Sequence, residues 1–314
     1  MSLNATMIFT AVEIRNSPTH AIGTGFLMSV RGEGNLNNRW PYVVTADHVI
    51  RGESSIYVAA PDPNGSGELY EPEPVNDWCQ PIPKLDLAVA PWPFKPKVPY
   101  GDIPMEKELY PLGDEHISLL GAPVHYVGLF APAQRMMVRA GTFGAIDAKG
   151  IAHDPDFDYE YDCHLIDCRS YGGFSGSPCF VELLFVKKEN WEGEEAFVPL
   201  YRALMVGMFT EHYDDSEDQK ASPDEAVSRL GVGMMVRGED IKRALLSDVM
   251  KADREKRESD LEKRGSEAPY VGPKVARVPE PTSDELKIFK SFAQDQIQTP
   301  KSNIDDVLRG HTQP

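Results

Sequence analysis

Short apolar runs follow one another along the first 250 residues of the chain, and helical periodicity is scarce among them. Glycine, proline, asparagine and aspartate separate the runs, which lie at residues 7–12, 24–30, 42–46, 85–90, 126–130 and 204–209. Such runs with turn signals between them are typical of strands, and many strands in one region favour a sandwich or a pair of barrels. The pattern predicts a mainly β domain over residues 1–250.

Helical spacing appears at the end of this region. Ile241, Ala244, Leu245 and Val249 recur at helical intervals, which predicts a helix that closes the domain and packs on its last strands. Residues 251–264 alternate charges without an apolar stripe. They are either a solvated helical extension or a disordered linker.

The tail, residues 251–314, is a second region in this interpretation, charged and partly helical. It carries as many basic as acidic residues, and a proline-rich linker leads to a segment in which Leu286, Phe289 and Phe292 share one helical face. One short amphipathic helix cannot bury a core of its own. We therefore expect a regulatory or docking tail that could recruit a regulatory protein or another effector.

Composition excludes several kinds of partner. The 314 residues include 32 basic and 49 acidic ones, a net charge of -17, which disfavours nucleic acid because phosphate binding depends on Lys and Arg. No apolar run approaches the about 20 residues of a membrane helix. The 4 cysteines are too few for a disulfide framework, and no signal-like segment opens the chain. We expect a cytoplasmic protein with free thiols, no membrane partner, no metal and no cofactor.

Three segments hold the candidate chemistry. A buried strand runs into His48, an apolar run contains Asp86, and a glycine-rich turn contains Ser175. Each segment alone also has a purely structural explanation. An acid in an apolar run is unfavourable to bury unless it is paired, and a histidine would pair with it usefully. The order His, Asp, Ser predicts a catalytic triad.

Other enzyme classes fit these residues less well. An α/β-hydrolase needs Gly-x-Ser-x-Gly with its acid and histidine downstream, but Ser177 stands at the last position of that motif. A zinc site would have to use Cys163, His164, Cys168 and Cys179, which do not have finger spacing. A cysteine nucleophile would need cysteine in place of Ser175, and we expect Cys179 to lie in the core instead.

Several motifs in order resemble the trypsin-like serine proteases of the chymotrypsin fold, closest in style to bacterial HtrA-type proteases and glutamyl endopeptidases. Thr-Ala-Asp-His at residues 45–48, Asp-Leu-Ala at 86–88 and Gly-Phe-Ser-Gly-Ser-Pro at 173–178 match that family's histidine, aspartate and serine segments. Further matches lie at residues 23–27, 126–128, 204–207 and 231–241. The resemblance implies a chymotrypsin-like double β-barrel with a closing C-terminal helix, and it ends near residue 250.

The resemblance also implies a mechanism. Ser175 would attack the carbonyl of a protein or peptide substrate, with His48 as general base and Asp86 holding the other ring nitrogen. The N–H groups of Gly173 and Ser175 would form the oxyanion hole. A serine endopeptidase is the function favoured by the intact triad. A non-catalytic peptide-binding module and an esterase or other acyl-transfer enzyme remain as alternatives.

Some positions depart from the family pattern. Phe174 replaces the acid that digestive members carry before the nucleophile, so activation by a new N-terminus is not implied. Phe209, two residues after Gly207, replaces the histidine of glutamyl endopeptidases, so strict glutamate specificity is not implied either. We expect Phe209 and Thr210 to wall the substrate pocket and Gly207 to take part in substrate binding. Arg169 lies where the pocket floor often is; it either favours an acidic substrate residue or serves as a salt-bridged loop residue.

Overall fold

A computed structural model describes most of the first 264 residues. The described ranges are 9–32, 38–61, 69–92, 102–110, 112, 119–133, 135–154, 159–168, 172–191, 194–212 and 231–264. The chain divides into two units, Met1–Gly272 and Pro273–Pro314, and every described residue belongs to the first. The predicted docking helix with Leu286, Phe289 and Phe292 lies outside the described residues.

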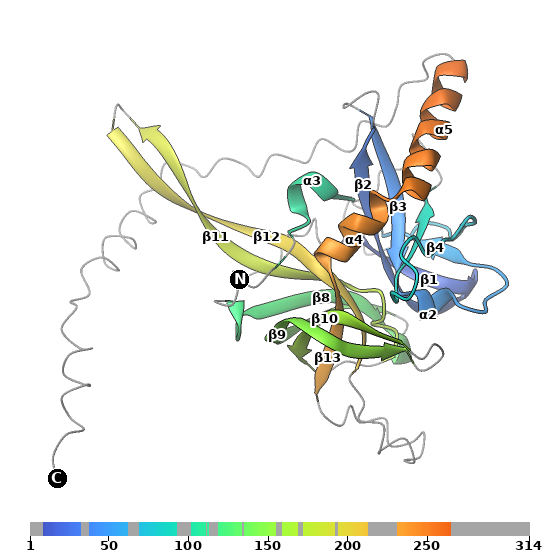
Figure 1. Ribbon diagram of the computed structural model, residues 1–314, viewed down its shortest axis with the longest axis horizontal. Helices are drawn as coiled ribbons and strands as arrows, with labels where there is room; N and C mark the ends of the chain where they lie inside the picture. The colour runs from blue at the N-terminus through green and yellow to red at the C-terminus, as the bar shows by residue number, and fades with distance from the viewer. Residues whose placement is uncertain are drawn as a thin grey trace, which may run out of the picture. The chain divides into compact units, whose positions relative to one another are not determined.

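The N-terminal half of the described chain forms a curled, 7-stranded sheet (Figure 1). Its strands are β1 (Ala11–Ser17), β2 (His20–Arg31), β3 (Arg39–Thr45), β4 (Tyr57–Ala59), β5 (Glu73–Pro74), β6 (Ala88–Pro91) and β7 (Ile103–Pro104). The order is β5-β4-β1-β2-β3-β6, and β7 pairs with β2 in parallel. Two one-turn helices, α2 (Asp47–Ile50) and α3 (Met105–Glu108), follow β3 and β7. The central strands are therefore fixed by neighbours on both sides.

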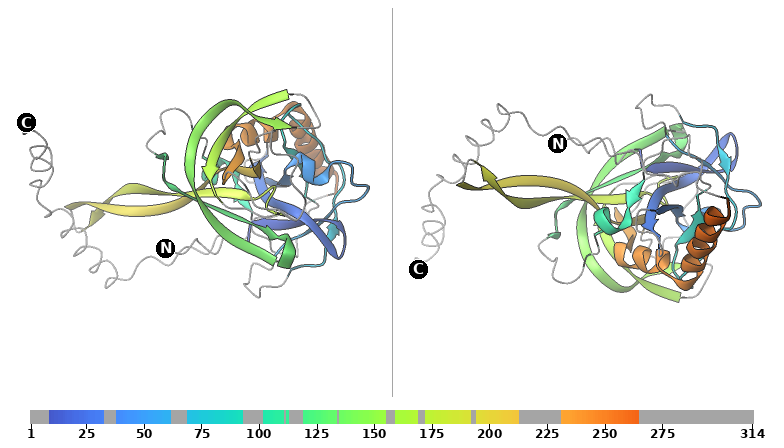
Figure 2. Two further views of the ribbon diagram at one scale, coloured as in Figure 1. Left: turned by 90° about the horizontal axis from the view of Figure 1, so that it is seen from below. Right: turned by 90° about the horizontal axis from the view of Figure 1, so that it is seen from above.

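The following strands close into a barrel with the order β10-β13-β12-β11-β8-β9. They are β8 (Pro123–Phe130), β9 (Arg135–Asp154), β10 (Tyr159–Asp167), β11 (Pro178–Trp191), β12 (Glu194–His212) and β13 (Val232–Arg237). A short 3-10 helix, η2 (Ala131–Ala133), connects β8 to β9. Figure 2 shows the curved strands of this barrel (green to yellow) beside the first sheet (blue), with β11 and β12 continuing past the barrel as a two-stranded ribbon. The predicted chymotrypsin-like double β-barrel is confirmed.

Apolar side chains fill the interior of both halves because strand residues alternate between the core and the surface. In the second barrel, Tyr126 stacks on Phe209 with ring centroids 5.4 Å apart and meets Phe174 edge to face, also at 5.4 Å. Phe174 is the residue immediately before Ser175, and it is fully buried. The aromatic cluster therefore anchors, in the core of the second barrel, the loop of residues 172–177, here called the nucleophile loop because Ser175 is the predicted nucleophile.

The predicted closing helix is α4 (Gly238–Leu245), which packs against β12 and β13. Ile241, Ala244 and Leu245 are fully buried, as their spacing predicted. The prediction was wrong for Val249, which is 57% exposed. The helix ends before that position: residues 246 and 247 form a turn and bend, and a new helix begins at Asp248 with a different buried face.

Residues 251–264 belong to α5 (Asp248–Arg264), so the helical alternative holds and the linker alternative does not. This helix packs along β3 rather than being solvated on all sides (Figure 1). Tyr42 Oη donates to Asp253 Oδ2 at 2.9 Å, and the buried Arg254 donates from Nη1 to the Leu245 carbonyl at 2.7 Å. The predicted domain boundary at residue 250 thus falls inside a helix. In the described ranges no helix is long and apolar enough to cross a membrane.

Candidate active site

His48 and Asp86 are joined directly. The Asp86 carboxylate accepts the His48 backbone N–H at 2.9 Å and lies 2.7 Å from ring Nδ1. Asp86 is 2% exposed, whereas the His48 side chain is 34% exposed. A carboxylate accepts from Nδ1–H, which leaves Nε2 of the neutral ring as the acceptor. The histidine therefore presents a basic nitrogen, and its tautomer is fixed from the buried side.

The loop that carries Asp86 is tightly built. Leu87 N–H donates to the Leu85 carbonyl at 2.7 Å, which folds the chain back around Asp86 itself. The Gln80 side-chain amide donates to the same carbonyl at 2.9 Å. Lys84 adopts a left-handed conformation with φ 67°. These contacts hold the Asp86 carboxylate in place just before β6 begins. The sequence does not indicate the role of Gln80, because its partner is a main-chain carbonyl.

Ser175 lies in the turn between Gly172 and β11, and it is half-buried. Two glycines with positive φ flank it: Gly173 at 100° and Gly176 at 88°. The turn is fastened to β12, because Gly176 N–H donates to the Phe209 carbonyl and Phe209 N–H to the Ser177 carbonyl, each at 2.8 Å. Ser175 therefore lies in a constrained turn immediately before β11.

This turn contacts the first sheet as well. Thr24 N–H in β2 donates to the Ser175 carbonyl at 3.0 Å, and a Cβ on Gly176 would lie 1.9 Å from the Thr24 carbonyl oxygen. Only glycine fits so close to that strand. Thr45, at the end of β3 and three residues before His48, donates its hydroxyl to the Thr24 carbonyl at 2.6 Å. Ser175 is thus joined to the sheet that carries His48, while direct contact between Ser175 Oγ and His48 remains a prediction.

The orientation of the predicted oxyanion donors follows from a second contact. The Gly172 carbonyl accepts from Ala131 N–H at 3.2 Å. A trans peptide carries its C=O and N–H on opposite sides, so the Gly173 N–H points away from Ala131. Among the described residues no backbone carbonyl accepts from the N–H of Gly173 or Ser175. Both donors remain candidates for an oxyanion hole.

The predicted pocket residues are described only in part. Arg169 lies outside the described residues. Phe209 and Thr210 are buried in β12, and Thr210 donates its hydroxyl to the Met234 carbonyl at 3.3 Å. A Cβ on Gly207 would lie 2.4 Å from the Val236 carbonyl oxygen, so close approach of β13 explains this glycine. The substrate-binding role of these positions stays a prediction.

Cys168 and Cys179 have thiol rather than thiolate character. Burial raises the pKa of Cys168 to about 11 and raises that of Cys179 well above its ordinary value. A thiol is a poor nucleophile and a poor metal ligand. Cys179 is fully buried in the second barrel, as expected of a core residue. Neither cysteine competes with Ser175 for a catalytic role.

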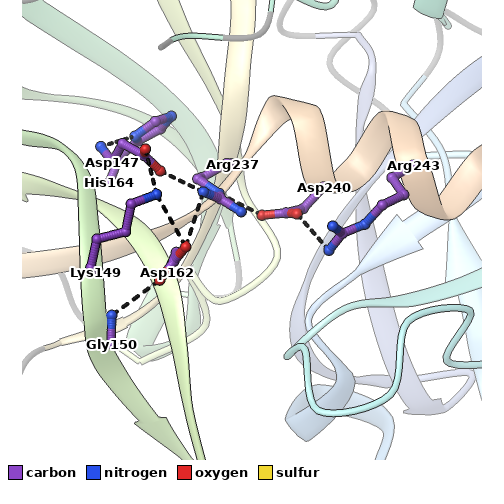
Figure 3. A network of polar contacts seen from close by, with 8 residues as sticks. All are labelled: Asp147, Lys149, Gly150, Asp162, His164, Arg237, Asp240 and Arg243. Atoms are coloured by element: carbon purple, nitrogen blue, oxygen red, sulfur yellow. Dashed lines mark hydrogen bonds and ion pairs between the residues drawn. The ribbon is translucent and has the colours of Figure 1, made fainter. Parts of the chain in front are cut away.

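A network of charged side chains, which sequence reasoning missed, joins the second barrel to α4 (Figure 3). Arg237 donates from Nε to Asp240 at 2.6 Å and pairs with Asp147 and Asp162. Lys149 contacts Asp162 at 3.2 Å. A cavity of about 330 Å³ beside this network is also lined by residues 82–85, which precede the buried Asp86. The network joins residues 147–162 to residues 237–243, so no local motif contains both groups.

Comparisons with solved structures return proteases. The MamO protease domain from Magnetospirillum magneticum is 18% identical, with 77% of this chain and 98% of that chain covered and a TM-score of 0.46. The active form of the Rv3671c protease from M. tuberculosis is 18% identical, with 77% and 81% covered and a TM-score of 0.46. The HtrA-type protease AlgW, solved with a tripeptide, is 16% identical, with 77% and 62% covered and a TM-score of 0.45.

Comparison of the sequence with curated proteins finds no match. The family model of the trypsin-like peptidase domain matches residues 23–182, which is half of the chain. This range begins at the Gly-Thr-Gly-Phe segment of β2 and includes His48, Asp86 and Ser175. The chain therefore belongs to the family of trypsin-like peptidase domains.

Proposed function

We propose that this protein is a serine endopeptidase that acts through His48, Asp86 and Ser175. One observation carries the proposal: the buried Asp86 carboxylate is bonded to both the main chain and the ring of His48, at 2.9 and 2.7 Å. A buried carboxylate that fixes the tautomer of a partly exposed histidine is what a serine nucleophile needs from its base. The turn bearing Ser175 is bonded to the same sheet, which supports the assignment.

The proposed reaction forms an acyl-enzyme. His48 Nε2 takes the proton of Ser175 as Oγ attacks the substrate carbonyl, and Asp86 stabilises the imidazolium without taking the proton. The N–H groups of Gly173 and Ser175 stabilise the oxyanion, and each donor contributes a few kcal/mol, roughly 3 to 4. The imidazolium then protonates the leaving amine. A water molecule, activated by the same base, releases the acid product and restores Ser175.

The substrate in this proposal is an extended protein or peptide segment. The expected pairing with β12 at residues 205–209 is not open to it, because these residues pair with β11 and the Ser175 turn on one side and with β13 or Tyr110 on the other. We propose that the substrate pairs with the following residues from Thr210 onward, since strand addition lets main-chain hydrogen bonds supply affinity while a pocket selects one side chain. Arg169 at the pocket floor would favour an acidic residue there. We also propose a cytoplasmic location, which is supported by Cys79, Cys163, Cys168 and Cys179 all being free thiols. A regulatory partner would bind the tail.

The test uses an active-site serine probe and a peptide library on the full chain. Ser175→Ala and Asp86→Asn are expected to lower peptide cleavage by about 10⁴-fold or more, with little change in Tm. Ser177→Ala is the matched control: it removes a buried hydroxyl two residues away that has no hydrogen-bond partner in the part of the chain that the structure describes, and it should stay active.

Each other outcome identifies a different function. Probe labelling and ester cleavage without peptide cleavage would indicate an esterase. Peptide binding by a protein that neither labels nor cleaves would indicate a non-catalytic binding module. Full activity in Ser175→Ala would refute the mechanism.

A further inference from the structure

Thr24 makes an unusual set of contacts for a residue in the middle of a strand. It is fully buried, and its main-chain N–H and C=O bond to Ser175 and Thr45 rather than only to neighbouring strands. Its hydroxyl donates to the Gly173 carbonyl at 2.7 Å and accepts the Leu129 N–H at 2.8 Å. One side chain therefore connects the first sheet, the nucleophile loop and β8.

Two of these bonds hold carbonyls on either side of Phe174. Thr24 N–H binds the Ser175 carbonyl at 3.0 Å, and Thr24 Oγ1 binds the Gly173 carbonyl. Because a peptide unit is planar, a fixed carbonyl also fixes the N–H of the following residue on the opposite side. Gly176 N–H accordingly points away from Thr24 and reaches the Phe209 carbonyl. Thr24 thus sets the planes of two peptides in the loop.

Gly173 is the joint at which the loop can turn. Its φ of 100° lies in a region that glycine enters freely, and it has no side chain to hold it there. The peptide before it is held by Ala131, through the Gly172 carbonyl, and the peptide after it is held by the Thr24 hydroxyl. Ala131 therefore fixes the direction of the Gly173 N–H, which belongs to the first of these peptides. Loss of the hydroxyl would release the Gly173–Phe174 peptide, which directly precedes the peptide that carries the Ser175 N–H.

We propose that Thr24 is a positioning residue that keeps the Ser175 N–H aimed at the developing oxyanion, because it holds the peptides on either side of the Phe174–Ser175 peptide. The inference rests on the proposed function, since it concerns the same site. In this proposal β2, a strand of the first sheet, controls the reactivity of a loop in the second barrel. The hydroxyl is required because it donates and accepts at once, which a serine reproduces and a valine of the same shape does not.

The experiment compares Thr24→Val with Thr24→Ser in the full chain. In Thr24→Val we expect kcat to fall by about 10- to 1000-fold, the upper value being the loss of one oxyanion donor, with KM changed by less than about 3-fold. In Thr24→Ser we expect kcat within about 3-fold of the wild type. Thr24→Ala removes the same hydroxyl without a branched side chain and replaces Thr24→Val if that variant does not fold.

Ser29→Ala is the control for a lost buried hydroxyl. Ser29 lies in the same strand, is 2% exposed, and its hydroxyl accepts from Arg39 Nη1 at 2.9 Å, away from the nucleophile loop. This variant should keep the kcat of the wild type. Equal kcat losses in Thr24→Val and Ser29→Ala, or kcat unchanged in a folded Thr24→Val, would overturn the proposal.

Hydrogen exchange provides a readout that does not need activity. Without the hydroxyl, the Leu129 N–H loses an acceptor and the Gly173 carbonyl loses a donor. Amides of residues 172–177 and Leu129 should therefore exchange faster in Thr24→Val than in Thr24→Ser. Equal exchange in the two variants would refute the role of Thr24, even if the protein is active. If exchange differs as expected but the wild type cleaves no peptide, only the proposed function is refuted.

Discussion

His164 gives a pH dependence of stability whose size can be worked out. It lies in β10 and is fully buried; its Nδ1 accepts the Asp147 N–H at 3.0 Å, and its Nε2 has no hydrogen-bond partner among the described residues. Burial lowers the pKa of His164 from 6.5 to about 4. The imidazole is therefore neutral in the folded protein under conditions in which it binds a proton in the unfolded chain.

The sign follows from the proton balance. Above pH 6.5 the ring is neutral in both states and contributes no pH dependence. Between pH 6.5 and about 4 only the unfolded state binds the proton, so stability falls as the pH falls. Each pKa unit corresponds to about 1.4 kcal/mol. Between pH 7 and pH 5 this residue alone should remove about 2 kcal/mol from the free energy of unfolding.

Urea unfolding of the wild type and His164→Asn at pH 7 and pH 5 measures this effect. The asparagine Oδ1 keeps an acceptor for the Asp147 N–H and does not titrate. The wild type should lose about 2 kcal/mol more than the variant over this interval. Lys149 and Arg237 hold the pKa of Asp147 below its usual range, so the stability from that carboxylate is lost only at lower pH. An equal loss in both proteins would refute the reasoning.

Two further predictions concern the ends of the described chain and the substrate pocket. A chain that ends at Arg264 should keep its Tm. One that ends at Met250 loses the contacts of Asp253 to Tyr42 and of Glu258 to Trp40 and should melt roughly 5 °C lower or more, as followed by circular dichroism. Equal Tm values would show that α5 does not support the first sheet. Arg169→Ser should reduce cleavage after Asp and Glu far more than cleavage after Leu in a peptide library, and equal losses would assign Arg169 to structure.

The sequence predicts most of the strands and the pairing of Asp86 with His48, because both depend on local patterns. Most of the apolar runs lie in strands, although residues 85–87 of the run at 85–90 precede β6, and the acid in that run is paired with His48. Burial of Asp86 without a partner would be unfavourable, so a partner is expected from the residue type and its apolar neighbours. The prediction succeeded where a residue type is hard to accommodate in any other way.

The sequence does not predict how α5 packs. Its buried face contains Arg254, which is 0% exposed, and its contacts to β3 include Asp253 and Glu258. An arginine can bury its aliphatic stem while its guanidinium finds acceptors, here including the Leu245 carbonyl. A helix face of this kind is taken to be solvated when only its apolar residues are counted. The error arises from treating charge as equivalent to exposure.

The role of Thr24 was also beyond the sequence, for a different reason. Its hydroxyl bonds to groups 105 and 149 residues away, so no window along the chain contains both partners. The Gly-Thr-Gly-Phe segment that contains Thr24 indicates the family but not the partners of its hydroxyl. Contacts of this kind follow from the way the two halves of the domain pack, which propensity and periodicity do not specify.

The position of β2 explains why it is suited to hold the nucleophile loop. It pairs with β1, β3 and β7, so it is more constrained than any strand at the edge of the first sheet. A reaction between groups from two barrels requires that their separation stay constant to well under about 1 Å. β2 is bonded to the Ser175 turn and pairs with β3, the strand that leads into His48. The distance between Ser175 and His48 therefore depends on one paired sheet and not on two separate loops.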